Sequence, residues 1–304
     1  MNSEKSERIM RNPFNSAQYK NEDDLILIQK AKNGDRAALN ELIKKHQGYI
    51  YNVSLKFFNE LNKAQDATQE VLIKVLSNLG SYDPAKAQFR TWLYRITFNH
   101  FLNTKKSAFE QRYEIGFEKF FDVIQSTPDQ ELSHEEVINL KHEIEEAKVA
   151  CTAGMIMCLD REQRLTYIVG DVFEIDHKFG AEIFNITPEN FRKRLSRARQ
   201  DLYMWMNKRC GLVNEKNPCR CPKKTKGFIE RGYVNPDSLK WNSNVLSEIN
   251  ALTEKRVDDL LLERDKIAHS IFSQHPFKKT EVSSEQILHS ILDNPTFTIG
   301  FDLK

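Results

Sequence analysis

The sequence predicts an all-α protein with two helical domains, joined by an acidic linker and followed by a partly helical C-terminal extension. Apolar residues recur every three or four positions along most of the chain, which is the helical spacing. No period-two alternation lasts long enough to indicate a sheet. A basic stretch with the form of a helix-turn-helix follows the acidic middle. The 304 residues leave room for two small domains with extensions.

Four helices are predicted in the front half of the chain. Asp23 and Asp24 can cap the first, which Gly34 ends, and the second starts near Asp35. The third carries apolar side chains at steps of four, at Ala67, Val71, Val75 and Leu79. The fourth, from Phe89 to Lys106, mixes aromatic residues with basic and amide residues. That mixture suits single-stranded DNA, because bases stack on rings while cations follow the backbone. A packed core face is the alternative.

Charge is distributed unevenly, although the net charge is only +2. Residues 108–149 are rich in Asp and Glu, whereas Glu189–Arg209 is strongly basic. A chain with separated basic stretches is expected to touch nucleic acid at separate places, with solvated helix faces as the alternative.

The helix-turn-helix is predicted between Ile175 and Trp205. Thr187 is the expected N-cap of its second helix, and Pro188 takes the first helical position. The second helix is expected to bury Phe191, Leu195, Ala198 and Leu202, which are spaced four, three and four residues apart. Its outward Arg and Asn side chains could read base edges in the major groove. A packed basic helix without a DNA partner is the alternative.

Three cysteines, Cys210, Cys219 and Cys221, lie close together after this helix. Their basic neighbours are expected to lower the thiol pKa values, and zinc binding is a hypothesis for this cluster. A fourth ligand would have to come from Cys151, Cys158 or His177, and the usual C-x2-C spacing is absent. Three reduced cysteines in a basic loop is the alternative.

The cellular location is expected to be the cytoplasm. The cysteine count, five, is odd, which indicates a reducing compartment. The sequence contains no apolar run long enough for a membrane span, and its polar N-terminus lacks a secretory signal. It also contains no phosphate-binding glycine loop, H-E-x-x-H or G-x-S-x-G motif, so an enzyme is not expected.

Several motifs occur in one order along the chain. They are Lys32-Asn33-Gly34-Asp35, Asp66-Ala67-Thr68-Gln69-Glu70-Val71, Phe89-Arg90-Thr91-Trp92-Leu93-Tyr94-Arg95-Ile96, Leu159-Asp160-Arg161-Glu162-Gln163-Arg164 and Arg192-Lys193-Arg194-Leu195-Ser196-Arg197-Ala198-Arg199. Their order and spacing resemble regions 2 and 4 of extracytoplasmic-function sigma factors. The resemblance divides the chain into a polar tail (1–22), region 2 (23–107), the acidic linker (108–149), region 4 (150–206) and a C-terminal extension (207–304).

The resemblance implies a sigma factor that binds core RNA polymerase and directs promoter recognition, DNA melting and transcription initiation. It implies polymerase docking by Asp66, Gln69 and Glu70. It places the melted minus-ten element on Arg90, Trp92, Arg95, Asn99, Asn103, Lys105 and Lys106. It places duplex promoter DNA on Asn190, Arg192, Lys193, Arg194, Arg197 and Arg199. The linker matches the segment that family members thread through the polymerase, and an anti-sigma factor is a further conceivable partner.

Two departures from the family stand out. Glu189, Asn190 and Phe191 replace the usual residues at the head of the recognition helix, and about one hundred residues follow region 4. A helical stretch from about Asn244 to Phe272 is expected in that extension. Two other functions remain open: a helix-turn-helix regulator that does not join polymerase, and a metal or redox sensor acting through the cysteines.

Overall fold

The computed structural model describes residues 19–241, 261–273, 277–278 and 282–292. In these ranges the chain is helical and has no strand, and its one extended pairing is an isolated bridge between Cys210 and Cys219. The all-α prediction is confirmed. Within the same ranges, no helix is long and apolar enough to cross a membrane. The predicted tail up to residue 18, and the expected helical stretch between residues 244 and 260, lie outside the described residues.

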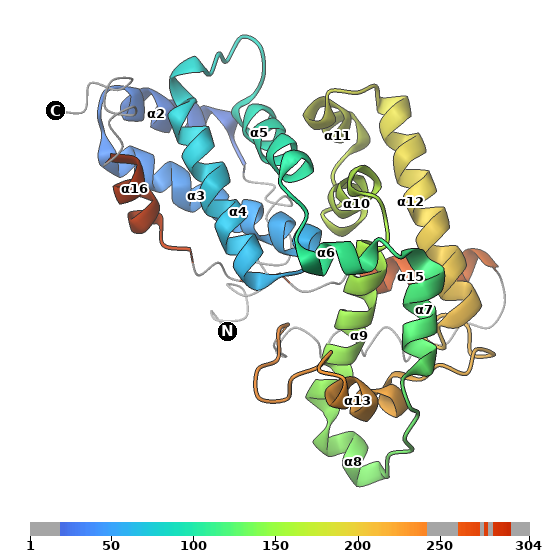
Figure 1. Cartoon of the computed structure of the whole chain (residues 1–304). Coiled ribbons are helices and arrows are strands. Elements are labelled where there is room, and N and C mark those ends of the chain that lie inside the picture. Colours follow the sequence, from blue (N-terminus) through green and yellow to red (C-terminus); the bar gives the residue numbers. More distant parts are fainter. Residues whose placement is uncertain (1–18, 242–260, 274–276, 279–281, 293–304) are drawn as a thin grey trace, which may run out of the picture. The chain divides into compact units, whose positions relative to one another are not determined.

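The chain folds into two compact units, each built from separate stretches of sequence (Figure 1). Unit 1 contains residues 1–105, 168–192 and 277–304, and unit 2 contains residues 106–167 and 193–276. The units are therefore interleaved along the chain, whereas the predicted domains are contiguous. The functional division into regions 2 and 4 stays a prediction.

Unit 1 is built around a long central helix, α3. Its elements are α2 (Asn21–Lys32), α3 (Arg36–Phe58), α4 (Leu61–Ser77), the 3₁₀ helix η1 (Leu79–Ser81), α5 (Phe89–Asn103), the π-helical turn η2 (Ile168–Val172), α11 (His177–Phe184), the first residues of α12 (Pro188–Arg209), and α16 (Ser284–Leu292). Helix α3 begins next to Asp35, as predicted. Asp35 caps it, because its carboxylate accepts hydrogen bonds from the backbone N–H groups of Ala37 and Ala38 at 2.9 and 3.0 Å.

Aromatic side chains fill the core of unit 1 where α3 meets α5. Phe57 and Phe101 are fully buried and stack with their ring centroids 5.6 Å apart, and Phe58 meets Phe101 edge to face at 5.4 Å. On the other side of α5, Phe98 packs against Phe184 of α11 with the centroids 5.2 Å apart. Helix α11 therefore covers part of α5.

Unit 2 surrounds α9 (Lys141–Met157), which packs against several other helices of the unit. Its elements are α6 (Ala108–Tyr113), α7 (Gly116–Ser126), α8 (His134–Asn139), α9, α10 (Arg161–Tyr167), most of α12, α13 (Cys221–Glu230) and α15 (Leu261–Ser273). Gly154 permits the contact between α7 and α9, because a Cβ atom there would lie 2.6 Å from the ring of Phe120. The stretch predicted as an acidic linker is thus largely helical.

A buried carboxylate joins α6 to α10. Glu110 is 1% exposed and accepts hydrogen bonds from Arg161 at 2.6 and 2.7 Å and from Arg164 at 3.0 Å. The two guanidinium groups outweigh the effect of burial and lower the pKa of Glu110. Arg164 also donates to the carbonyls of Met157 and Leu159, so this arginine fixes the turn between α9 and α10.

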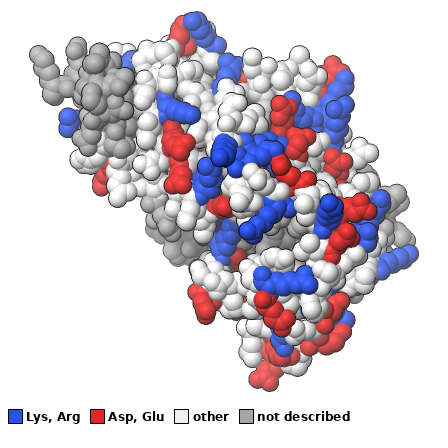
Figure 2. All heavy atoms as spheres, viewed as in Figure 1, with Lys and Arg blue, Asp and Glu red and all other residues white. Residues whose placement is uncertain are grey.

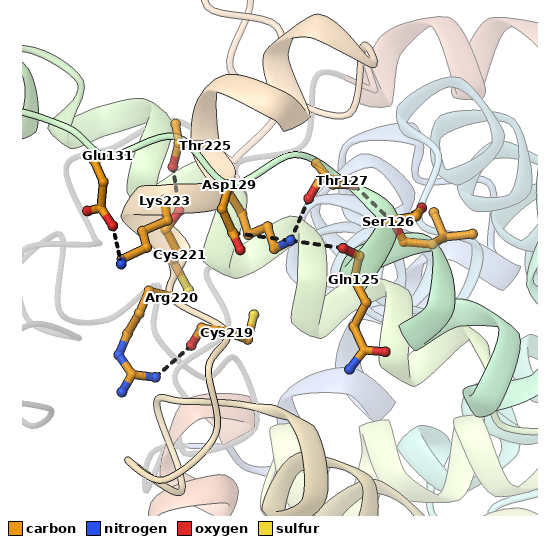
Figure 3. A network of polar contacts seen from close by, with 12 residues as sticks. Gln125, Ser126, Thr127, Asp129, Glu131, Cys219, Arg220, Cys221, Lys223 and Thr225 are labelled. Atoms are coloured by element: carbon orange, nitrogen blue, oxygen red, sulfur yellow. Dashed lines mark hydrogen bonds and ion pairs between the residues drawn. The ribbon is translucent and has the colours of Figure 1, made fainter.

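Helix α13 is attached to the chain that follows α7. The ammonium group of Lys224 donates to the carbonyls of Gln125 and Thr127, and Lys223 forms an ion pair with Glu131 (Figure 3). The C-terminal extension is therefore partly helical, as predicted, and its first helix packs within unit 2.

Candidate nucleic-acid interface

The predicted docking residues lie on one exposed face of α4. Gln69 and Glu70 follow Asp66 by three and four positions, and all three side chains are exposed. The opposite face of α4 is buried through Ala67 and Val71, which are 1% and 0% exposed. The apolar period thus fixes which way the three polar side chains point.

Contacts with α5 hold Glu70 in place. Its carboxylate lies 3.3 Å from Nε2 of His100, whose Nδ1 is 2.8 Å from the ammonium group of Lys74. Burial lowers the pKa of His100, which favours the neutral ring. A neutral ring with its proton on Nε2 donates to Glu70 and accepts from Lys74 at Nδ1. Glu70 is therefore oriented, and 57% of its side chain remains exposed.

The residues predicted to hold melted DNA occupy different environments on and after α5. Asn99, Asn103, Lys105 and Lys106 are exposed, and Trp92 is half-buried with its ring 5.4 Å from that of Tyr82. Lys106 forms an ion pair with Glu114. Helix α5 ends at Asn103, so Lys105 and Lys106 follow the helix instead of extending it.

Two arginines of α5 differ from the exposed positions expected for DNA contacts. Arg90 is 9% exposed, and its guanidinium carbon lies 4.0 Å from the ring centroid of Tyr19. Arg95 is half-buried and donates to the carbonyl of Glu182 in α11 at 2.8 Å. Arg90 therefore packs inside unit 1, and Arg95 is engaged by the helix that covers α5.

The helix-turn-helix forms as predicted at its turn and along its buried face. Thr187 caps α12 by accepting from the N–H of Asn190 at 3.2 Å, and Asn185 ends α11 in the left-handed conformation with φ of 53°. The expected buried residues Phe191, Leu195, Ala198 and Leu202 are between 0% and 9% exposed. Gly180 is required here, because a Cβ atom would lie 2.6 Å from the ring of Phe191.

The opposite face of α12 presents its basic residues to solvent. Asn190, Arg192, Lys193, Arg197 and Arg199 are all exposed. Arg194 is the exception: it is half-buried and forms a salt bridge with Glu162 at 2.8 Å. On the face shown in Figure 2, basic side chains lie at the surface beside acidic ones.

Comparison with known proteins finds a likeness for the part of the chain that contains α4 and α5. Residues 42–108, which contain α4 and α5, match the family model of sigma-70 region 2. This part of the chain is therefore similar to sigma-70 region 2.

Several sigma factors are similar to this chain. Among them, the sigma-H factor of Pseudomonas aeruginosa is 37% identical over 78 residues, which is 26% of this chain and 40% of that protein. The extracytoplasmic-function factor SigE of Mycolicibacterium smegmatis is 25% identical over 179 residues, or 58% of this chain and 65% of that protein. SigM of Bacillus subtilis is 24% identical over 170 residues, or 56% and 96%. The chain thus spans less than two thirds of the length of the first two relatives.

The cysteine cluster outside region 2 differs from the expectation for reactive thiols. Burial raises the pKa of Cys210 to about 11, and it also raises the pKa values of Cys219 and Cys221. The predicted lowering is wrong because loss of hydration at these thiols outweighs the nearby cations. Among the described residues, no three His, Cys, Asp or Glu side chains are placed to hold a metal ion. The zinc hypothesis therefore gains no geometric support and stays a prediction.

Sequence reasoning did not single out a polar network that joins α2 to α3 in unit 1. Asp24 is fully buried. It forms an ion pair with Lys45 at 2.7 Å and a hydrogen bond with Nε2 of His46 at 3.1 Å. These two partners, with Tyr19, lower the pKa of Asp24 to about 2 against the opposing effect of burial. The carboxylate does not cap α2, which begins earlier, at Asn21. The sequence signal that could have revealed this network is an Asp placed one turn into a helix that buries apolar residues.

Proposed function

We propose that this protein is a sigma factor that binds core RNA polymerase and directs it to promoter DNA. The observation that carries the proposal is the match of residues 42–108 to sigma-70 region 2, which covers both the docking helix and the aromatic helix. The helix-turn-helix of α11 and α12, at the position of region 4, supports a second contact with duplex DNA. The names of the relatives, all sigma factors, support the same function.

Docking on polymerase is assigned to the exposed face of α4. Asp66, Gln69 and Glu70 present two carboxylates and an amide from a rigid helix, and a buried histidine orients Glu70. Such a surface suits a basic partner surface, because paired charges fix the register and orientation of a complex.

Binding of the melted minus-ten strand is assigned to the exposed end of α5 and to Trp92. Asn99, Asn103 and Lys105 can reach bases and phosphates without rearrangement, because they are exposed. Arg95 must first release the carbonyl of Glu182, so its use requires α11 to leave α5. Arg90, packed beneath Tyr19, is assigned a structural role.

A transcription assay with purified core polymerase tests the function. The wild-type chain should support specific initiation, and the double charge reversal Asp66→Lys with Glu70→Lys should abolish binding to core polymerase while duplex DNA binding by α12 persists. The matched control is Glu41→Lys with Glu118→Lys, which changes the net charge equally at two other exposed glutamates.

The outcomes separate the alternatives. Loss of polymerase binding in the first variant alone, with an unchanged helical circular dichroism spectrum, supports the docking assignment. Specific DNA binding without any binding of core polymerase by the wild-type chain would favour a free-standing helix-turn-helix regulator. Equal loss in both double variants would mean that the effect comes from net charge and not from α4.

A further inference from the structure

Asn52, in the middle of α3, holds the backbone of a residue near the other end of the chain. Its Nδ2 donates to the carbonyl of Lys278 at 2.8 Å, and the N–H of Lys278 donates to its Oδ1 at 2.7 Å. Nδ2 also donates to the carbonyl of Gly48 at 2.8 Å, which fixes the rotation of the amide. Asn52 is 4% exposed and Lys278 is half-buried, so these bonds are partly shielded from water. One side chain thus satisfies both backbone groups of Lys278, much as a neighbouring strand would.

The preceding residue, Phe277, adds an aromatic anchor. Its ring meets Phe173 edge to face with the centroids 5.2 Å apart, and Nζ of Lys56 lies 4.5 Å from its centroid. Phe173 is fully buried and Lys56 is 4% exposed. The backbone pairing at Asn52 accepts any residue except proline, which lacks the N–H, whereas the ring contacts select an aromatic side chain at position 277.

A short helix completes the contact. Helix α16 packs against α3 and α4 and lies beside them in Figure 1. Its buried residues Ser284 and Ile287, 6% and 1% exposed, are three positions apart and share one face. Asp66, Gln69 and Glu70 on α4 remain exposed with α16 in place. The segment therefore covers a part of α4 that differs from the docking face.

We propose that Asn52, Lys56 and Phe173 form a binding site for the chain's own C-terminal segment, here called the strap: Phe277, Lys278 and α16. The strap leaves region 2 free to bind a partner through the exposed face of α4. Its removal would uncover the amide of Asn52 and apolar surface on α3 and α4, each at a cost in free energy, so the attached state is favoured.

Amide hydrogen exchange in the full chain tests the site. In the wild-type protein, the amides of Lys278 and α16 should exchange far more slowly than in a free peptide of residues 277–292. Phe277→Ala, which changes only the strap, should speed their exchange at least tenfold and leave α2–α5 protected. Asn52→Ala should do the same, and Asn62→Ala, at an exposed asparagine of α4, should change nothing.

A competition experiment adds a readout that does not depend on exchange rates. A labelled peptide of residues 277–292 should bind the full-length Phe277→Ala chain at least tenfold more tightly than the wild-type chain, whose own strap fills the site. Adding Asn52→Ala to that variant should abolish the difference. Free-peptide exchange rates across the strap in the wild-type chain, or equal peptide binding by the two chains, would overturn the proposal.

Discussion

Lys56 carries an ammonium group in a place where water is excluded. The residue lies on α3 beneath the ring of Phe277 and is 4% exposed. Burial lowers its pKa to about 7, because the charged form loses its hydration there. In the unfolded chain the same amine titrates near 10.5. Folding therefore favours the neutral amine.

This shift predicts how stability depends on pH. Between pH about 7 and about 10.5 the unfolded chain binds a proton that the folded chain does not, so the free energy of unfolding rises with pH in this window. Lys56→Met removes the penalty and should stabilise the protein by roughly 1–4 kcal/mol at neutral pH, since one pKa unit corresponds to about 1.4 kcal/mol.

Urea unfolding of both proteins at two pH values measures the effect. The advantage of Lys56→Met should shrink as the pH is raised from about 7 to about 9, because the wild-type penalty fades. The control is Lys44→Met, which removes an exposed lysine of the same helix. A stabilisation that does not depend on pH would show that the amine is not the cause.

At the level of the helix, α12 carries arginines in two environments, exposed to solvent or engaged in a salt bridge. Arg197 is exposed on the face opposite the buried residues, whereas Arg194 is tied to Glu162. We expect Arg197→Ala to weaken binding to promoter duplex by roughly 1–3 kcal/mol if its contact is bidentate to a base. Arg194→Ala should cost less, because its salt bridge must first be given up.

Fluorescence anisotropy over a range of salt concentrations tests this ordering. Affinity should fall with salt for every protein, because phosphate contacts release counterions. The matched control is Arg112→Ala, which removes an exposed arginine of α6. If Arg112→Ala and Arg197→Ala weaken binding equally, α12 does not enter the groove.

The sequence predicted those elements that depend on local chemistry. The Thr187 cap and the buried stripe of α12 follow from spacing and side-chain type, and both are confirmed. It did not predict features created by distant partners. The burial of Arg90 depends on Tyr19, some seventy positions earlier, and the place of Asn52 depends on Lys278. Nothing in the sequence around Tyr19 or Lys278 indicates these contacts.

The candidate site shows the same contrast between features set by local sequence and features set by distant partners. Exposure of the docking face was predictable, because the period of α4 points Asp66 and Glu70 away from Val71. The contact between Arg95 and Glu182 was not, because nothing in either helix indicates that α11 packs on α5. The helices of the acidic stretch were missed for another reason: charge was used there as a sign of an open linker, although Ser133 and Glu136 form a capping box.

At the scale of the whole molecule, unit 1 cannot be cut out along the boundaries of region 2. A fragment of residues 23–107 lacks α11, which covers Phe98, and α16, which covers part of α3 and α4. We expect this fragment to unfold with roughly 2–5 kcal/mol less stability than unit 1 in the full chain, from the loss of buried apolar contacts. It should also bind a hydrophobic dye that the full chain does not bind.

Denaturant unfolding followed by a probe in α5 compares the two proteins. The intrinsic fluorescence of Trp92 serves in the fragment, and the same signal is isolated in the full chain with Trp205→Phe and Trp241→Phe. Equal unfolding midpoints and no dye binding by the fragment would mean that α11 and α16 add little to unit 1.

The interleaved order of unit 1 also determines when each of its helices leaves the ribosome. A ribosome releases the chain from its N-terminus, so helices α2 to α5 emerge before any part of α11 and long before α16. The apolar surfaces of α2 to α5 lack their last partner, α16, until both stretches of unit 2 have been translated. Contacts this distant in sequence also carry a loop-closure cost that slows folding. We therefore expect the nascent chain to expose apolar surface of α2 to α5 until α11 and α16 have left the exit tunnel.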